Sequence, residues 1–191
     1  MQKNNFKLVI LIVLDGWGLS ENKKGNAMLK AKLPTIDKLN KFYPHMALQA
    51  SGISVGLPWG EPGNSEVGHI TLGTGQTIYQ NMPRITMAIQ DGEFFKNSAF
   101  LEAINHCKKN NSALHLMGLV GKGGIHSIVD HLYGLLELAR DQKFGNVFLH
   151  LFTDGRDSPP TSGAESLKEV QKKLDIYKVG RIATIGGRYY A

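Results

Sequence analysis

The chain has 191 residues, 42% of them hydrophobic and 20% charged, which excludes a disordered polypeptide and allows one domain or two small ones. Its single cysteine, Cys107, excludes an internal disulfide and a multi-cysteine zinc site, and it fits a buried thiol in a reducing, cytoplasmic setting. The net charge of +6 raises the question of an anionic partner, which is either nucleic acid or a small phosphorylated substrate. No basic run has aromatic residues interleaved with it, so we interpret most of the charge as solvated surface and expect no nucleic acid, although basicity alone does not identify the partner.

The first predicted element is a strand over the apolar run Leu8–Leu14, whose β-branched and leucine residues are typical of a strand covered on both faces. The run is far too short to span a bilayer, so we expect no membrane partner. Residues 44–80 are rich in Gly, Pro, Ser and Thr, which predicts active-site loops with a short helix after Ser65. We therefore place a domain boundary near residue 80.

The rest of the chain alternates between two kinds of predicted element. Continuous apolar runs predict strands over 114–120, 147–153 and 181–185, and helical periodicity predicts helices over 98–108, 128–142 and 161–175. Ser162 and Glu165 form a capping-box pattern at the start of the last helix. This alternation predicts an α/β fold with a mainly parallel sheet.

Charged or imidazole side chains follow each predicted strand, next to glycine. In parallel α/β sheets, ligands bind beyond the carboxyl ends of the strands, so these residues are candidates for one site. The four strand ends carry Asp15, His126, the segment 154–157 and Arg188.

Two of the candidates suit phosphoryl chemistry, although each also has a structural interpretation. Asp15 is either a ligand for a hard divalent cation or a turn residue beside glycine. Ser65 stands where helix N–H groups favour a phosphoryl group, or it is an ordinary helix cap. The chain has no Gly-x-Ser-x-Gly elbow, and Lys122 is followed by Gly, which excludes a P-loop.

The remaining candidates suit an anionic substrate. Arg156 and Arg188 together fit a molecule that carries both phosphate and carboxylate, whereas either alone is more typical of a surface ion pair. His126 and Asp130 lie one helical turn apart, so they either share a metal or face different surroundings. The other histidines (45, 69, 106, 115, 131 and 150) are interpreted as structural, His69 least firmly.

Five segments, taken together and in this order, resemble one family. They are Val-Leu-Asp15-Gly-Trp-Gly, Pro-Gly-Asn-Ser65-Glu-Val-Gly-His, Gly-Gly-Ile-His126-Ser, Thr-Asp-Gly-Arg156-Asp157 and Gly-Arg188-Tyr-Tyr-Ala. The family is the 2,3-bisphosphoglycerate-independent phosphoglycerate mutases, and the resemblance runs from about residue 8 to the last residue.

The resemblance implies a three-layer α/β protein with an alkaline-phosphatase-like metal domain and a second α/β domain inserted into it. Residues 1–79 would open the metal domain, and residues 80–191 would form the first part of the inserted transferase domain. Asp15 and Ser65 would ligate one of two Mn²⁺ ions, with Ser65 as nucleophile. The substrate-binding residues would be His126, Arg156, Asp157 and Arg188, with Asp157 also carrying the proton.

The implied reaction interconverts 3-phosphoglycerate and 2-phosphoglycerate through a phosphoserine, without 2,3-bisphosphoglycerate. The complete enzyme would be monomeric and cytoplasmic. Because the family continues beyond Ala191, we expect this chain to be a truncated product or one half of a split enzyme. We expect it to be inactive by itself, with poor stability and exposed sheet edges. A complementary carboxyl-terminal chain is a candidate partner.

One departure from the family pattern bears on the site. Gly121 and Lys122 stand where the family commonly has Ser-Asp, which is expected to alter the orientation of His126 or the charge near it. The alternatives to a mutase are a related metal-dependent phosphatase or phosphopentomutase, a basic nucleic-acid-binding module, and a noncatalytic protein that retains the fold.

Overall fold

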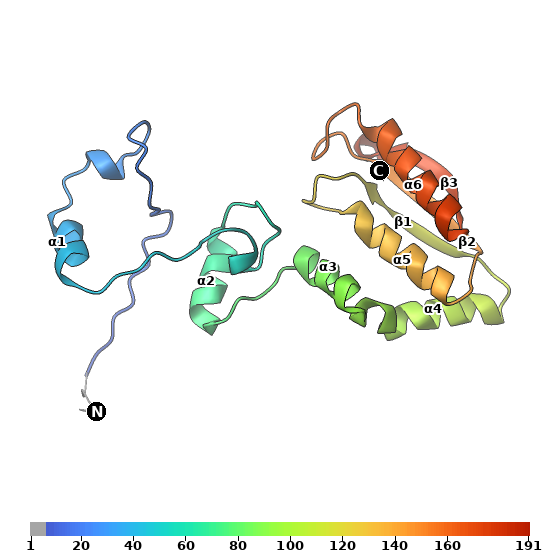
Figure 1. Cartoon of the computed structure of the whole chain (residues 1–191), viewed down its shortest axis with the longest axis horizontal. Helices are drawn as coiled ribbons and strands as arrows, with labels where there is room; N and C mark the ends of the chain where they lie inside the picture. Colours follow the sequence, from blue (N-terminus) through green and yellow to red (C-terminus); the bar gives the residue numbers. More distant parts are fainter. Residues whose placement is uncertain (1–6) are drawn as a thin grey trace.

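Tertiary packing is distributed unevenly along the chain (Figure 1). The structure is a computed structural model that describes residues 7–191. None of the residues 7–50 is buried, whereas the main hydrophobic core is formed by residues between Ile104 and Val179. The fold that positions most of the candidate site residues is therefore in the second half of the chain.

Three parallel strands form the only sheet among the described residues. They are β1 (Leu114–Val120), β2 (Val147–Thr153) and β3 (Arg181–Gly187), in the order β1-β2-β3 with an irregularity between Leu149 and His150. Consecutive parallel strands need crossover connections, and the helical segments between them supply these. The predicted α/β class and parallel sheet are confirmed.

Three helices cover one face of this sheet and enclose the core. They are α4 (Ser98–Lys109), α5 (Val129–Asp141) and α6 (Gly163–Tyr177), close to the predicted bounds. Their buried side chains pack against alternate residues of β2, of which Leu149 and Leu151 are almost completely buried. Burial of each such leucine contributes about 1.5–3 kcal/mol.

The capping box predicted at the start of α6 is not formed. Ser162 does occupy the N-cap position, but its hydroxyl donates to the carbonyl of Pro159 at 2.8 Å and makes no side-chain cap to the helix. The backbone conformation of Ser162 is helical, which turns its side chain away from the N–H groups of the first turn.

The other face of the sheet carries a ladder of aromatic and imidazole rings. His115 Nδ1 lies 2.9 Å from His150 Nε2, and His150 Nδ1 lies 2.8 Å from the Thr184 hydroxyl, so one chain of hydrogen bonds crosses all three strands. The ring of His115 also stacks on the ring of Phe148. The guanidinium of Arg181 lies 4.2 Å from the centre of the same Phe148 ring. These contacts explain why the two histidines are on the sheet.

The predicted strand over Leu8–Leu14 is wrong for this structure. The segment is neither paired nor covered, and its side chains are between 42% and 85% exposed. A strand needs a neighbour to complete its backbone hydrogen bonds, and no segment within 7–191 pairs with this one. Its sequence is strand-like, but the partner is missing.

Short helices make up most of the remaining amino-terminal structure. They are η1 (Met28–Lys30), α1 (Pro34–Phe42), η2 (Gly52–Val55) and α2 (Ser65–Thr74), the last confirming the short helix predicted after Ser65. A small cluster of three buried residues holds η2 against α2: Val55, Leu57 and Val67.

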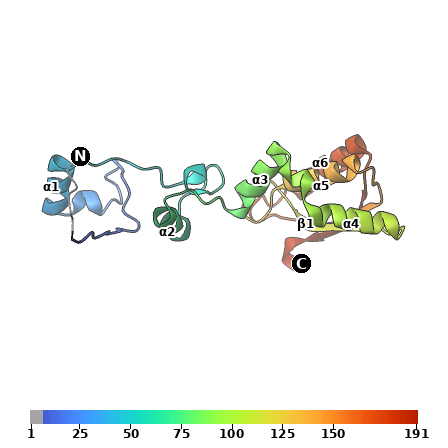
Figure 2. The same cartoon turned by 90° about the horizontal axis from the view of Figure 1, so that it is seen from below.

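A single stretch of chain leads from α2 to the α/β part. Helix α3 (Asn81–Asp91) begins there and is followed by η3 (Glu93–Lys96). Helix α3 contacts α5 through Thr86, whose Oγ1 lies 2.9 Å from His131 Nε2. In both views the sheet edge formed by the carboxyl ends of the strands faces the side on which α2 lies (Figures 1 and 2). No helix among residues 7–191 is long and apolar enough to cross a membrane.

Candidate active site

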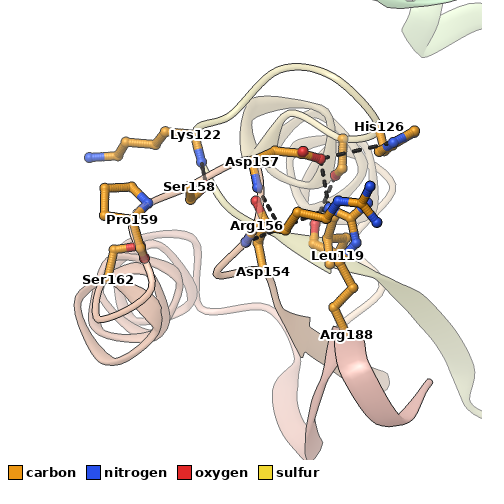
Figure 3. Close-up of polar contacts among 11 residues, drawn as sticks. Leu119, Lys122, His126, Asp154, Arg156, Asp157, Ser158, Pro159, Ser162 and Arg188 are labelled. Carbon is orange, nitrogen blue, oxygen red and sulfur yellow. Dashed lines mark hydrogen bonds and ion pairs between the residues drawn. The ribbon is translucent and has the colours of Figure 1, made fainter.

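Three loops leave the same edge of the sheet, because the carboxyl ends of parallel strands lie together. The loop after β1 carries His126, the loop after β2 carries the segment 154–158, and Arg188 directly follows β3. Figure 3 shows the side chains of these loops converging on one another. Sequence positions that are 62 residues apart thus share one small region.

The loop after β1 is tied down at both ends. Ser127 donates to the carbonyl of Leu119 at 2.7 Å, and the backbone N–H of Lys122 donates to the Ser158 hydroxyl at 3.2 Å. Between them, Gly123 lies so close to the backbone of Asp157 that a Cβ at this position would overlap it. The loop is therefore shaped by direct backbone contact with its neighbour.

The loop after β2 folds around the carboxylate of Asp154. Its Oδ1 accepts hydrogen bonds from the backbone N–H groups of Arg156 and Asp157, each at 3.2 Å. Aspartate commonly forms such a turn by bonding its own backbone two and three residues on. The turn fixes the direction in which the Asp157 side chain leaves the loop.

Arg188 is held between two carboxylates. Its Nη1 donates to Asp154 Oδ1 at 2.9 Å and to Asp157 Oδ2 at 2.6 Å. The side chains are 3% exposed for Asp154, 11% for Asp157 and 22% for Arg188, so these charge-assisted bonds are shielded from water.

The electrostatics of Asp154 follow from these contacts. Burial by itself raises the pKa of this carboxyl, but hydrogen bonds from Arg188, from two backbone N–H groups and from Ser158 together lower the pKa to about 2. Asp154 is thus ionised at neutral pH, at the bottom of the cluster.

His126 is at the open side of the cluster. Its side chain is 63% exposed, and Nε2 lies 4.0 Å from Asp157 Oδ2, which is beyond hydrogen-bonding distance. Residues 7–191 contain no group of three or more His, Cys, Asp or Glu side chains that could hold an ion, and a metal shared by His126 and Asp130 alone stays untested.

Arg156 differs from the other predicted substrate residues. It is exposed, and within the described part of the chain its guanidinium makes no hydrogen bond or ion pair. The structure therefore brings together His126, Asp157 and Arg188, and it leaves Arg156 beside them on the same turn.

Lys122 does not place its charge next to His126. Its ammonium forms an ion pair with Glu169 of α6 at 2.7 Å, and Figure 3 shows the side chain extending away from His126. The ammonium of Lys122 is thus directed away from His126, whereas an effect of the Gly121-Lys122 pair on the orientation of His126 or on the local charge balance stays a prediction. The neighbouring position is also constrained, because a Cβ on Gly121 would lie 2.6 Å from the Ser158 hydroxyl.

Asp15 and Ser65 form a second group, in the amino-terminal part. The hydroxyl of Ser65 donates to Asp15 Oδ2 at 2.6 Å, and both residues line a shallow depression together with Trp17 and His69. His69 Nδ1 lies 2.7 Å from the Ser65 carbonyl, a contact within one helical turn. Within residues 7–191 no hydrogen bond or ion pair joins this group to the Arg188 cluster.

Ser65 is free to make this bond because its neighbour caps the helix. Asn64 is the N-cap residue of α2, and its side chain accepts from the backbone N–H of Val67 at 3.0 Å. Ser65 is the first helical residue, so the interpretation of Ser65 as an ordinary cap is wrong. Gly63 precedes this pair and contacts the carbonyl of Ala50 so closely that no Cβ fits there.

The oxygen atoms of Asp15 and Ser65 suit a hard divalent cation. Carboxylate and hydroxyl oxygens are the donors that such ions select, and the two side chains are near enough to bind the same ion. Two ligands fill only part of a coordination shell, and no larger cluster of ligating side chains is present in the described residues. The pair fits a partial metal site.

Asp154 and Ser158 organise this site although the sequence predicts no separate role for either residue. Asp154 directly follows a strand and precedes glycine, which is the signal for an aspartate that organises a turn. Its ion pair with Arg188 joins residues 34 positions apart and has no signal in the sequence.

The chain is similar to known proteins over nearly all of its length. A family model described as BPG-independent PGAM N-terminus matches residues 85–191. The chain is 52% identical over 184 residues to the 2,3-bisphosphoglycerate-independent phosphoglycerate mutase of Lachnoclostridium phytofermentans, covering 96% of this chain and 36% of the relative. It is also 52% identical over 185 residues to the enzyme of the same name from Clostridium perfringens strain SM101, with 97% and 36% covered.

A solved structure gives the same result at the level of the fold. The phosphoglycerate mutase of Leishmania mexicana, crystallised at low cobalt concentration, superposes with a TM-score of 0.63 and 32% identity, covering 83% of this chain and 30% of that one. The present chain thus spans about a third of the length of the proteins that it matches. It belongs to the family of BPG-independent phosphoglycerate mutases, which are isomerases, and corresponds to their amino-terminal part.

Proposed function

We propose that the chain supplies the nucleophile and part of the substrate site of an enzyme that interconverts 3-phosphoglycerate and 2-phosphoglycerate. The observation that carries the proposal is the hydrogen bond between Ser65 and Asp15. It joins a hydroxyl at a helix start to a carboxylate, which is the arrangement that phosphoryl transfer to serine requires. The separate cluster around Arg188 supports a substrate that is retained during the reaction.

Asp15 and Ser65 would hold one of two Mn²⁺ ions, and such an ion lowers the pKa of the serine hydroxyl and neutralises charge on the transferring group. Ser65 Oγ, after losing its proton to solvent, would form a bond to phosphorus while the bond from phosphorus to the substrate oxygen breaks, and Asp157 in its acid form would give a proton to that oxygen. Helix α2 starts at Ser65, so its first N–H groups and its dipole favour the resulting phosphate.

The second half of the reaction requires that glycerate stay bound while it reorients. His126, Arg156 and Arg188 would bind it, with the arginines as donors to its carboxylate. Asp157 would then take the proton from the 2-hydroxyl of glycerate, whose oxygen attacks the phosphoserine and releases Ser65. No 2,3-bisphosphoglycerate takes part in these steps.

We further propose that residues 1–79 belong to a metal-binding domain and residues 80–191 to a transferase domain; the first six lie outside the described residues. The missing metal ligands and further substrate-binding cations would come from the part of the family sequence that follows, as a complementary carboxyl-terminal chain. The whole enzyme would act as a cytoplasmic monomer, in keeping with a single buried, unpaired cysteine.

Complementation tests this proposal. Purified chain is supplied with Mn²⁺ and 3-phosphoglycerate, alone and mixed with a polypeptide that carries the rest of the Clostridium perfringens relative. We expect 2-phosphoglycerate only from the mixture, and none when Ser65→Ala replaces the native chain. Ser98→Ala is the matched control, because Ser98 also opens a helix behind a capping asparagine.

Three results would contradict the proposal. Robust turnover by the chain alone would contradict the partial metal site, and full activity of Ser65→Ala in the mixture would exclude Ser65 as nucleophile. Release of inorganic phosphate in place of 2-phosphoglycerate would indicate a phosphatase.

A further inference from the structure

The guanidinium of Arg188 uses only one of its nitrogens within the cluster. Both carboxylates accept from Nη1, which carries two hydrogens, one for Asp154 and one for Asp157. In the part of the chain that the structure describes, neither Nε nor Nη2 of Arg188 takes part in a hydrogen bond. Those two nitrogens form an edge of the planar group that matches a carboxylate.

The two carboxylates that hold Arg188 are not equivalent. The side chain of Asp154 is almost completely buried, and the same oxygen that accepts from Arg188 also accepts hydrogen bonds from two backbone N–H groups of its own turn. A hydrogen bond from Ser158 adds to these contacts. Asp157 has more exposure and lies next to His126 at the open side of the cluster. Asp154 is therefore the immobile partner.

The difference matters during the reaction that we propose above, on which this inference rests. Asp157 would gain a proton there, and a neutral carboxyl is a weaker partner for a guanidinium than a carboxylate. If Asp157 alone held Arg188, the arginine would loosen when it must retain the glycerate carboxylate. A second carboxylate that keeps its charge prevents this.

We propose that Asp154 is a positioning residue, which fixes Arg188 through Nη1 so that its Nε and Nη2 donors remain available to the substrate carboxylate whatever the protonation of Asp157. Asp154 does not touch the substrate in this proposal. It acts through Arg188, and it does so by charge as well as by the shape of its turn.

The test compares two isosteric variants of the full chain by NMR. Asp154→Asn keeps an oxygen for the backbone N–H groups but removes the charge, and Asp157→Asn removes the charge of the other partner. The side-chain Nε–H signal of Arg188, assigned with Arg188→Lys, reports the order of the guanidinium. We expect an order parameter near that of rigid backbone in the native chain and in Asp157→Asn, and a fall below about 0.6 in Asp154→Asn.

Binding provides the second readout. We expect the affinity for 3-phosphoglycerate, measured by calorimetry, to fall about tenfold or more in Asp154→Asn, because a charge-assisted anchor is lost. Asp141→Asn is the matched control, since Asp141 forms an exposed ion pair with Arg140, and this variant should bind as the native chain does.

The outcomes are distinct. An Arg188 that stays ordered in Asp154→Asn, or becomes mobile in Asp157→Asn, overturns the inference. If Asp154→Asn does not fold, Asp157→Asn still decides between the two carboxylates. If the native chain binds no 3-phosphoglycerate even when it is mixed with the carboxyl-terminal polypeptide, the proposed function loses support, and the order of Arg188 still tests the role of Asp154.

Discussion

Ser65 Oγ lies 2.6 Å from Asp15 Oδ2, although fifty positions separate the two residues in the sequence. The contact depends on a turn at Gly16 and on the start of α2, and it makes Asp15 the sole carboxylate bonded to this hydroxyl among the described residues. The relationship gives the first prediction.

Replacement of Asp15 by Asn should weaken the binding of Mn²⁺ by at least about tenfold, because the proposed metal site would lose its charged ligand. Electron paramagnetic resonance of free Mn²⁺ in a titration measures this. Asp37→Asn, on the exposed helix α1, should bind Mn²⁺ like the native chain. Equal affinity of both variants would remove Asp15 from the metal site.

The substitution Gly123→Ala should separate the loop of His126 from Asp157. The added Cβ would overlap the Asp157 backbone, and such overpacking costs about 1–3 kcal/mol. Urea unfolding measures the loss, and the affinity for 3-phosphoglycerate should fall with it. Gly118→Ala adds the same methyl group into open space and should leave both quantities unchanged. A Gly123→Ala chain with native stability and affinity would contradict the close contact.

Loss of the Lys122 ion pair should have little effect. The pair with Glu169 is exposed at both side chains, and such pairs contribute little to stability. Lys122→Ala should therefore leave the midpoint of thermal unfolding and the affinity for 3-phosphoglycerate close to native values. A strong loss of affinity would show that the ammonium reaches the ligand after all.

Stability should fall in mildly acidic solution because of His131. Burial lowers the pKa of this imidazole below its ordinary value of 6.5, and Asp130 opposes the effect only in part. The unfolded chain then binds the proton more readily than the folded chain. The contribution is thus fully present above pH 6.5 and is lost as the pH falls through 6.5 to the folded pKa.

Urea unfolding at pH 8 and at pH 5.5 measures this loss as a lower free energy of unfolding at the acidic pH. His131→Gln should reduce the difference between the two pH values. His106→Gln, at an exposed position of α4, should keep it. A pH dependence that is the same in both variants would exclude His131 as its source.

The exposed segment Leu8–Leu14 should make the chain prone to self-association. Ile10 and Ile12 are 70% and 73% exposed within a β-branched run that has no paired neighbour. Ile10→Lys combined with Ile12→Lys should delay aggregation, measured by light scattering, without lowering the thermal midpoint. Leu149→Ala in the core is the control: it should lower the free energy of unfolding by about 2–5 kcal/mol and so lower the thermal midpoint. Faster aggregation of the lysine variant would contradict this view.

The sequence was most informative where structure is local. The strands and helices from Ser98 onward were predicted within a few residues, because periodicity and glycine signals act over short distances. The residues at the strand ends were found in the same way, since parallel strands bring them to one edge.

Contacts between residues that are far apart in the sequence could not be predicted from the sequence. Leu8–Leu14 has the pattern of a buried strand, yet a strand forms only where another strand can pair with it. The ion pair between Lys122 and Glu169 depends on how α6 packs. The two hydrogen bonds from Arg188 to carboxylates depend on the loop after β2 lying next to the end of β3. Neither relationship has a local signature.

The uninterrupted run of sequence that carries the Arg188 cluster has an evolutionary consequence. His126, Asp157 and Arg188 follow the successive strands of one small sheet, so a single gene segment encodes these three residues of the proposed substrate site. Such a segment can be inherited, exchanged or grafted as a unit. The serine and its aspartate, encoded upstream and short of ligands, have no comparable independence.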